Sequence, residues 1–251
     1  MIQVPTDPTF HLLFDAAAWA TGIATGVVLY RWRLAEVTAT VARVADRGYF
    51  IALAAGAVSG AYLSGSFTFW SQGIFALAHS VAGALIGAIA AFELYKLARG
   101  IRLSTGIIFV GPFAAGVAFG CWGCLFAGPA DQTFGTPTSL PWAVDIGDGV
   151  ARHPVQAYEA LGMLAFLLFF VVGLNSRARW AMRDGFYWMA IAYGAQRFAW
   201  EFLKPYPAFV GPLNHFHLLC LALVAYGIVM LRRQRGRERG SIAATSRSVS
   251  S

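Results

Sequence analysis

The chain has 251 residues, of which 58% are hydrophobic and only 12% are charged, and its mean hydropathy is +0.59. A soluble domain usually has about 25% charged residues, so this composition excludes an ordinary soluble globular protein. The net charge of +7 does not indicate nucleic-acid binding, because the basic residues lie between apolar blocks and form no separate basic domain.

Seven apolar blocks follow one another along the chain, and we expect each to form a transmembrane helix. They lie at residues 10–30, 49–68, 74–97, 105–128, 154–174, 185–204 and 211–231, with ends defined to within several residues. Residues 1–10 contain no Lys or Arg, unlike the basic start of a cleavable signal peptide, so the first span is expected to stay in the mature protein. We therefore predict an all-α protein with one seven-helix membrane domain at 1–235, followed by a disordered cytoplasmic tail at 236–251.

The basic residues alternate between the two sides of these spans. Of the 19 Lys and Arg residues, 16 lie near the ends of spans 1, 3, 5 and 7 or in the segments that follow them. Cytoplasmic segments carry such an excess, so the N-terminus is expected outside and the C-terminus in the cytoplasm. The outer loop 129–153 is rich in Pro and Gly, and Trp142 is expected to lie at the membrane surface.

Under this topology, most ionisable and thiol side chains within the spans lie toward the outer face. They are His11, Asp15, His79, Cys121, Cys124, Glu159, Arg197, Glu201, His215 and His217. Ionisable groups are costly in a bilayer and are functional candidates by default, so we predict one pocket in the outer half of the membrane. Glu93 is the exception; it lies near the inner end of span 3, where we expect it to snorkel toward Lys96 or to pair with it.

The segment 152–159 (Arg-His-Pro-Val-Gln-Ala-Tyr-Glu) opens the fifth span. Pro154 suits the first turn of a helix, where the N–H that it lacks would have no intrahelical partner. Gln156 and Glu159 are three residues apart and share a helix face, with Tyr158 beside them. The candidate site residues of this segment are His153, Gln156, Tyr158 and Glu159.

Span 6 contains Tyr193, Arg197 and Glu201, which are spaced four residues apart along one helix face. One interpretation is an internal Arg–Glu pair that neutralises itself. However, Arg before Glu is the less favourable order for a helix pair. The planar guanidinium is also well suited to hold a phosphate, so we favour a functional role for Arg197.

Cys121 and Cys124 form a Cys-x-x-Cys pair near the end of span 4. Such a pair can serve redox chemistry or metal binding. Small residues flanked by glycines more simply predict close helix packing, and a closed metal site would need further ligands from His79 or His215. We therefore expect neither a metal nor a cofactor. All three cysteines, including Cys220, lie in apolar blocks, so no disulfide framework is predicted.

Segments 152–159, 193–201 and 119–142 together resemble the prolipoprotein diacylglyceryl transferase family of bacterial inner-membrane enzymes. The segment 153–159 resembles the family's His-Pro-x-Gln-Leu-Tyr-Glu motif, with Ala157 in place of Leu. The spacing in span 6 matches its Tyr-x-x-x-Arg-x-x-x-Glu helix. Residues 83–87 are similar to its Gly-Gly-Leu-Ile-Gly motif, and the glycine-rich signature is matched by Gly123, Gly128 and Gly135.

The chain also departs from the family pattern. The signature Gly-Arg-x-Gly is here Gly-Cys-Trp-Gly, so Cys121 replaces a phosphate-binding arginine. The family's histidine before the span 3 glycines falls on Ala82, one helical turn after His79. The span 1 tyrosine aligns roughly with Asp15. The acidic residue after the signature falls on Pro129, with Asp131 as a possible substitute.

The resemblance implies transfer of a diacylglyceryl group from phosphatidylglycerol to the cysteine of a prolipoprotein signal peptide, in the bacterial inner membrane and without a cofactor. It implies that Arg197 holds the leaving phosphate, that Glu201 and Glu159 orient Arg197, and that His79 or His153 takes the thiol proton. The residues implied to bind substrate are Gln156, Tyr158, Glu159, Tyr193, Gly123, Gly128 and Gly135.

Two other functions are compatible with the same residues. One is a non-catalytic or substrate-altered relative that binds phospholipid as an accessory membrane protein, because the signature arginine is Cys121. The other is a transporter that uses the charges of the outer half as a relay. A relay would need polar residues continuing into the cytoplasmic half, where the sequence has almost none, so the transporter is the weakest alternative.

Overall fold

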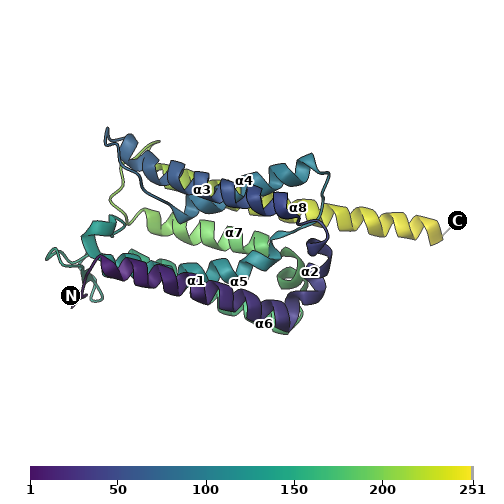
Figure 1. The fold of residues 1–251 in the computed structure, drawn as a ribbon, viewed down its shortest axis with the longest axis horizontal. Helices are drawn as coiled ribbons and strands as arrows, with labels where there is room; N and C mark the ends of the chain where they lie inside the picture. The colour runs from purple at the N-terminus through teal and green to yellow at the C-terminus, as the bar shows by residue number, and fades with distance from the viewer. Residues whose placement is uncertain (250–251) are drawn as a thin grey trace.

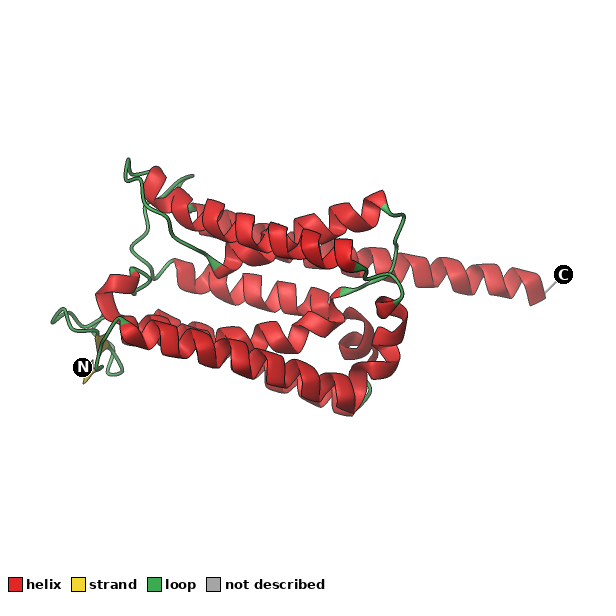
Figure 2. Cartoon of the chain, viewed as in Figure 1, coloured by secondary structure: helices red, strands yellow, loops and turns green. Residues whose placement is uncertain are grey.

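The computed structural model describes the backbone of residues 1–249 and their side chains except at 40 and 238–249. In this range the chain is almost entirely helical, as its composition predicts (Figures 1 and 2). The exceptions to helix are loops and two short strands, β1 (Ile2–Gln3) and β2 (Val144–Asp145), which pair in parallel and tie the N-terminus to the loop before α6.

Seven long helices form a bundle within the described residues. They are α1 (Thr9–Leu29), α3 (Arg47–Trp70), α4 (Val81–Ala98), α5 (Val110–Ala127), α6 (Val155–Asn175), α7 (Arg179–Glu201) and α8 (His215–Val249). A π-helical turn, Tyr30–Leu34, and α2 (Ala35–Ala42) continue α1, while 3-10 turns at Gly106–Phe109 and Gly128–Asp131 flank α5.

Six of these helices are long and apolar enough to cross a membrane, so the chain is a multi-pass membrane protein. The helix outside this set is α7. It is less hydrophobic because it carries Arg179, Arg183 and Asp184 in its first turns and Arg197 and Glu201 near its end. Those charges keep it out of this set, although the predicted span 185–204 covers most of it.

The predicted third span, 74–97, begins too early. The structure starts α4 at Val81, and residues 71–80 form a turn and an extended segment in which Gly73 has a φ of +77°. Ser80 caps the helix, since its hydroxyl accepts a hydrogen bond from the Gly83 N–H at 3.2 Å. The predicted pairing of Glu93 with Lys96 is confirmed, because Lys96 Nζ lies 3.0 Å from Glu93 Oε1.

The helices pack as pairs whose arrangement leaves space within the bundle. α1 packs against α5, α3 against α4, and α7 against α8, while α6 lies beside α5 and α7. The two ends of the chain lie at opposite ends of the bundle (Figure 1). α8 continues as a helix through the predicted tail as far as Val249, and residues 250–251 lie outside the described range. The division into a membrane domain and a disordered tail stays a prediction.

Candidate functional site

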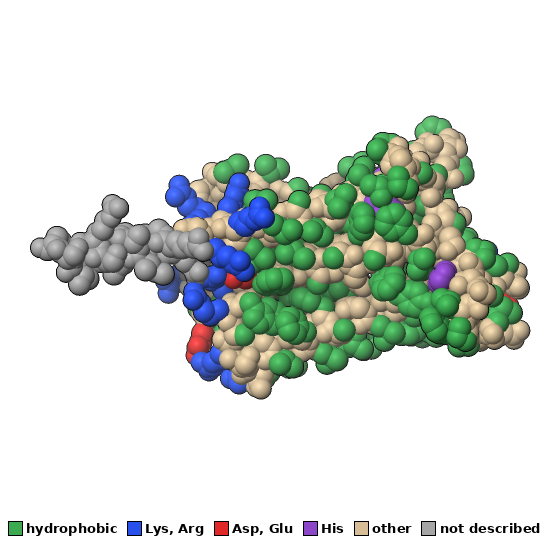
Figure 3. Space-filling view, turned by 180° about the vertical axis from the view of Figure 1, so that it is seen from behind, with side chains coloured by type: hydrophobic (Ala, Val, Ile, Leu, Met, Phe, Trp, Pro, Cys, Tyr) green, Lys and Arg blue, Asp and Glu red, His purple; other side chains and the backbone are tan. Residues whose placement is uncertain are grey.

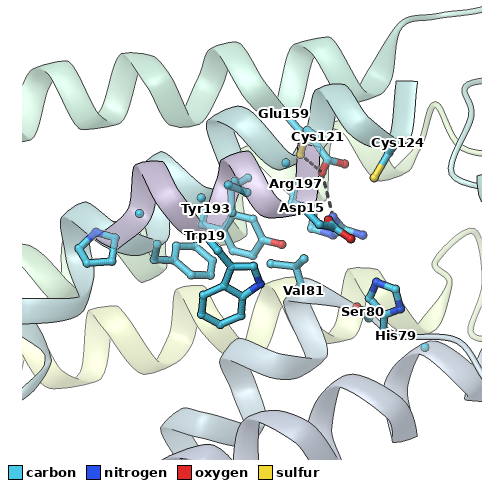
Figure 4. Close-up of a pocket in the computed structure, with 18 of the residues that line it drawn as sticks. Asp15, Trp19, His79, Ser80, Val81, Cys121, Cys124, Glu159, Tyr193 and Arg197 are labelled. Carbon is cyan, nitrogen blue, oxygen red and sulfur yellow. Dashed lines mark hydrogen bonds and ion pairs between the residues drawn. The ribbon is translucent and has the colours of Figure 1, made fainter. Parts of the chain in front are cut away.

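A cavity of about 1890 Å³ lies between α1 and α5 on one side and α3 and the start of α4 on the other. Most of its wall is apolar, and most of its polar side chains, including those of His11, His79 and Arg197, lie toward the end of the bundle where α1 starts, whereas Arg31 and Thr38 line it near the other end. Figure 4 shows Tyr193 and Trp19 beside the cavity, with His79 and Ser80 entering from the α4 side. Five candidate residues line this space together: His79, Gln156, Glu159, Tyr193 and Arg197.

Arg197 is held in the wall of the cavity by carboxylates from two helices. Its Nη1 lies 2.9 Å from Glu159 Oε2 on α6, and its Nη2 lies 3.8 Å from Glu201 Oε2 on α7. The Arg197 side chain is 11% exposed, and those of Glu159 and Glu201 are 5% and 0% exposed. Glu201 does not line the cavity and lies behind the guanidinium, where Asn214 Nδ2 donates to its Oε1 at 3.2 Å. Arg197 thus lies closer to Glu159 than to Glu201, the partner suggested by spacing along the helix.

Two polar atoms of this wall have no hydrogen-bond partner among the described residues. They are Arg197 Nε and the Tyr193 hydroxyl, both of which are buried. Tyr193 packs edge-on against Phe113, with ring centroids 5.0 Å apart. Buried donors without partners are rare in proteins, so each is a candidate for contact with a ligand in the cavity.

Lys204 is a functional candidate that sequence reasoning missed. It follows α7, and its side chain is 2% exposed. Its Nζ lies 2.5 Å from Glu159 Oε1 and 3.8 Å from Glu201 Oε2, and it also lines the cavity. Glu159 therefore bridges two cations. The available signal was the position of Lys204 three residues after Glu201, which places a cation within one turn of that carboxylate.

Cys121 occupies the place of the signature arginine. Its Sγ lies 3.8 Å from Glu159 Oε2, the oxygen that Arg197 also contacts, and the dashed lines in Figure 4 follow this chain of contacts. Both Cys121 and the neighbouring Gly120 line the cavity. A side chain longer than cysteine at position 121 would therefore have room to extend into the cavity.

The two candidate histidines lie in different surroundings. His79 lines the cavity, and its ring centroid lies 6.1 Å from that of His11 on α1. His153 does not line the cavity. Its backbone N–H donates to the Thr136 carbonyl at 3.0 Å, and its ring Nδ1 is buried without a partner among the described residues. His153 thus anchors the loop before α6, and His79 faces the space that a ligand would fill.

The loop 132–154 also holds Tyr158 away from the cavity. The Tyr158 hydroxyl accepts a hydrogen bond from Trp142 Nε1 at 2.7 Å, and its ring packs against Trp200. Trp142 is 50% exposed. In the same loop, the Arg152 side chain donates to Asp148 and holds the pKa of that carboxyl below its ordinary value.

The signature glycines shape the protein around the cavity and do not line it. Gly123 lies under Phe14, where a Cβ would come within 2.7 Å of the Phe14 Cβ, so it lets α1 approach α5. Gly128 has a φ of +72°, which favours glycine, and reverses the chain after α5. At Gly135, a Cβ would collide with the His153 backbone. These three residues therefore act through packing in this structure.

His217 and His215 have protein partners at the start of α8. His217 is 1% exposed, and its Nδ1 and N–H both bond to Asn214. His215 Nε2 lies 3.0 Å from the Ser64 carbonyl oxygen. His217 is therefore tied through Asn214 to Glu201.

His11, Cys124 and Asp131 meet at the polar end of the cavity, and sequence reasoning did not connect them. Their potential ligand atoms all lie within 4.8 Å of one another. Gln156 lies nearby, with its Nε2 donating to Thr133 Oγ1 at 3.4 Å. Asp131 is more than 100 residues from His11 in the sequence, so no local pattern could have revealed this contact.

Comparison with known proteins identifies relatives for most of the chain. The prolipoprotein diacylglyceryl transferase family model matches residues 9–233. A phosphatidylglycerol–prolipoprotein diacylglyceryl transferase of Finegoldia magna is 35% identical over 49% of this chain and 48% of its own length. The protein of that name in Polynucleobacter necessarius subsp. necessarius is 31% identical over 70% of this chain and 66% of its own length, and that in Methylococcus capsulatus is 34% identical over 59% and 58%.

The chain thus spans about half to two thirds of the length of these relatives. No solved structure matches it.

Proposed function

The chain belongs to the prolipoprotein diacylglyceryl transferase family, and from this premise we propose that it transfers a diacylglyceryl group from phosphatidylglycerol to the lipobox cysteine of a prolipoprotein. Its relatives carry both substrates in their names. The family assignment rests on the match over residues 9–233 and agrees with the resemblance of the two polar helix motifs.

One observation carries this proposal: a buried, carboxylate-oriented guanidinium in the wall of a large, mainly apolar cavity. Arg197 is fixed by Glu159 and Glu201 while its Nε has no partner among the described residues. Acyl chains need an apolar space of this size, and a phosphate needs charge-assisted donors at its edge. Lys204 lines the same cavity and places a second cation there.

In the proposed reaction, the thiolate sulfur of the acceptor cysteine attacks the glycerol carbon that bears the phosphate ester. The new bond is C–S, the bond that breaks is C–O, and glycerol phosphate leaves with the electron pair. Arg197 and Lys204 stabilise the negative charge that develops on the phosphate in the transition state. The proton released by the thiol needs a base near the attacking sulfur.

His79 is the better candidate for that base. A neutral imidazole can accept a proton from a thiol. His79 lines the cavity, whereas His153 lies outside it and bonds to the loop. The roles of Gln156 and Tyr193 in this proposal are polar contacts with the lipid headgroup, since both line the cavity near Arg197. Tyr158 and the three signature glycines support the wall.

The proposal includes an orientation in the bacterial inner membrane, with α7 as the sixth of seven spans. Lys and Arg side chains gather at the end of the bundle from which the C-terminal tail leaves, and histidines lie toward the other end (Figure 3). By the positive-inside rule, the basic end faces the cytoplasm. The polar end of the cavity and the N-terminus then face the periplasm, where the acceptor signal peptide emerges.

The test is transfer of a diacylglyceryl group to a lipobox peptide in phosphatidylglycerol vesicles, measured by the mass of the peptide. We expect Arg197→Ala to lower the rate by at least about 10²–10³, the usual cost of a lost charge-stabilising donor. Arg99→Ala is the matched control, because Arg99 is 61% exposed at the basic end and its loss should leave the rate unchanged. Arg197→Lys keeps the buried charge and separates loss of the guanidinium from unfolding.

The outcomes distinguish the candidate functions. Full activity of Arg197→Ala would remove Arg197 from the mechanism. If the unchanged protein shows no turnover but binds phosphatidylglycerol, and Arg197→Ala weakens that binding, the chain is an accessory lipid-binding relative. The names of the relatives favour the enzyme over this alternative.

A further inference from the structure

We propose that His11, Cys124 and Asp131 form a binding site for one divalent cation of the zinc class, at the polar end of the cavity. The three residues come from three separate elements: the start of α1, the end of α5 and the 3-10 turn at Gly128–Asp131. Each offers one ligand atom, and these atoms lie within 4.8 Å of one another.

The distances fit a tetrahedral metal. His11 Nε2 lies 3.0 Å from Asp131 Oδ1 and 3.9 Å from Cys124 Sγ. Ordinary zinc bond lengths at a tetrahedral angle place such N···O and N···S pairs about 3.4 and about 3.6 Å apart. Each of these two pairs therefore needs to move by only a few tenths of an ångström to bind one ion, and Cys124 Sγ lies within 4.8 Å of the Asp131 carboxylate oxygen.

The other side of the His11 ring supports this assignment. Its Nδ1 lies 2.9 Å from Asp15 Oδ2, one turn further along α1. A histidine that binds a metal through one nitrogen usually donates its other N–H to a carboxylate, which fixes the tautomer and the ring orientation. Asp15 thus positions His11 with Nε2 turned toward Cys124 and Asp131.

The donor set selects the metal. One thiolate, one imidazole and one carboxylate suit Zn²⁺, whereas Mg²⁺ and Ca²⁺ prefer oxygen ligands alone. Three protein ligands also leave one position open, as in catalytic zinc sites. All three residues line the cavity, so the open position faces the space assigned to the lipid headgroup and can take a water or an anionic oxygen.

Without a metal, the same contacts would form an ion triad, in which the His11 ring lies between the carboxylates of Asp15 and Asp131. Cys124 would take no part in this triad. The two arrangements differ in the role of the sulfur. A metal site requires the Cys124 thiolate, while an ion triad does not involve it. This difference defines the experiment, which measures metal binding and is independent of any transferase activity.

The full chain, purified in detergent and stripped of metal, is titrated with Co²⁺ as a spectroscopic probe for zinc. We expect one equivalent to produce the visible bands of tetrahedral Co²⁺ and a thiolate-to-cobalt charge-transfer band, and Zn²⁺ to displace both. Cys124→Ser should abolish the charge-transfer band. Cys121→Ser is the matched control, since Cys121 lines the same cavity outside the ligand set and should leave the spectrum unchanged.

Two more variants keep the test decisive. Asp15→Asn leaves the three ligands in place, so it should retain the bands with an affinity about 10–100-fold weaker. His11→Ala should abolish stoichiometric binding, whereas His79→Ala should not. The proposal is overturned if the unchanged protein shows no charge-transfer band, or if Cys124→Ser keeps it. It is also overturned if His11→Ala binds as tightly as the unchanged protein.

Discussion

At the scale of single residues, the important feature is the four-charge cluster of Arg197, Lys204, Glu159 and Glu201. Two cations face two carboxylates with little exposure to solvent. Breaking a buried ion pair leaves an uncompensated charge, so each member constrains the other three. Because Glu159 belongs to α6 and the others belong to α7 or its end, the cluster also ties these helices together.

We predict strong energetic coupling between Glu159 and Lys204. Glu159→Gln or Lys204→Met alone should each lower the free energy of unfolding by about 3–5 kcal/mol, because the partner is left buried and unpaired. The free energy of unfolding of the double variant should fall by much less than the sum of the two single decreases. The measurement is a double-mutant cycle from unfolding in mixed micelles.

The exposed pair Asp46 and Arg99 provides the control for that cycle. Its side chains are 53% and 61% exposed, so its coupling should be much smaller. Strict additivity of Glu159→Gln and Lys204→Met would contradict a coupled buried cluster.

Cys121 offers a gain-of-function prediction. Cys121→Arg should place a second guanidinium next to Glu159 and the cavity, and raise the transfer rate by up to about 10²–10³. Cys121→Met provides a longer side chain than cysteine without charge and should give no increase. The rates are compared in phosphatidylglycerol vesicles, and an unchanged or lower rate for Cys121→Arg would show that charge at this position does not limit the reaction.

The sequence predicted the members of this site better than their pairings. Arg197, Glu201 and Glu159 were identified because ionisable groups within apolar spans are costly. The choice of Glu159 as the nearer partner of Arg197 depends on how α6 and α7 are rotated against each other, which no local spacing encodes. The contact of Lys204 with Glu159 and that of Asp131 with His11 were not predicted for the same reason, since these partners lie on other helices.

At the scale of helices, glycines determine how closely α3 and α4 approach. Gly56 and Gly60 on α3 lie against Gly83 and Gly87 on α4, so that a Cβ at Gly87 would overlap the Gly56 carbonyl oxygen. Small residues four apart allow membrane helices to bring their backbones together. The glycines that resemble a family motif in the sequence are therefore explained here by backbone contact.

We predict that Gly87→Ala destabilises the protein by about 1–3 kcal/mol, because the added methyl group forces the two backbones apart. Gly116→Ala on α5 is the matched control, since its Cβ would meet only the Ala18 carbonyl oxygen at 3.8 Å. Thermal unfolding in detergent should show a lower midpoint for Gly87→Ala and a midpoint near that of the unchanged protein for Gly116→Ala. Equal midpoints would contradict the packing argument.

The helices were predictable to within a few residues at most ends, whereas the start of α4 was not. Residues 74–78 are apolar, and hydropathy therefore extended the predicted span into them. The helix begins only after Ser80, whose hydroxyl caps it, and Phe75 in the preceding segment is 97% exposed. Hydropathy measures preference for an apolar environment and not helical hydrogen bonding, so it cannot locate such a cap.

At the scale of the whole molecule, the cavity lies within a bundle whose two ends differ in charge. Lys and Arg gather at one end (Figure 3), and most of the polar side chains that line the cavity lie toward the other. This asymmetry predicts a periplasmic N-terminus and a cytoplasmic C-terminus.

Reporter fusions test this orientation. Alkaline phosphatase fused after Trp142 should be active, because the enzyme folds only in the periplasm, and a fusion after residue 237 should be inactive. Green fluorescent protein fused after residue 237 should fluoresce. The reverse pattern would place the polar end of the cavity in the cytoplasm and contradict the proposed access of the signal peptide.

Complementation tests most directly whether Arg197 supports lipid transfer to prolipoproteins. The chain is expressed in bacterial cells depleted of their own transferase, and lipoprotein maturation is followed by gel mobility and mass spectrometry. We predict that the unchanged chain and Arg99→Ala restore maturation and that Arg197→Ala, expressed at the same level, does not. Failure of the unchanged chain, or rescue by Arg197→Ala, would contradict the account.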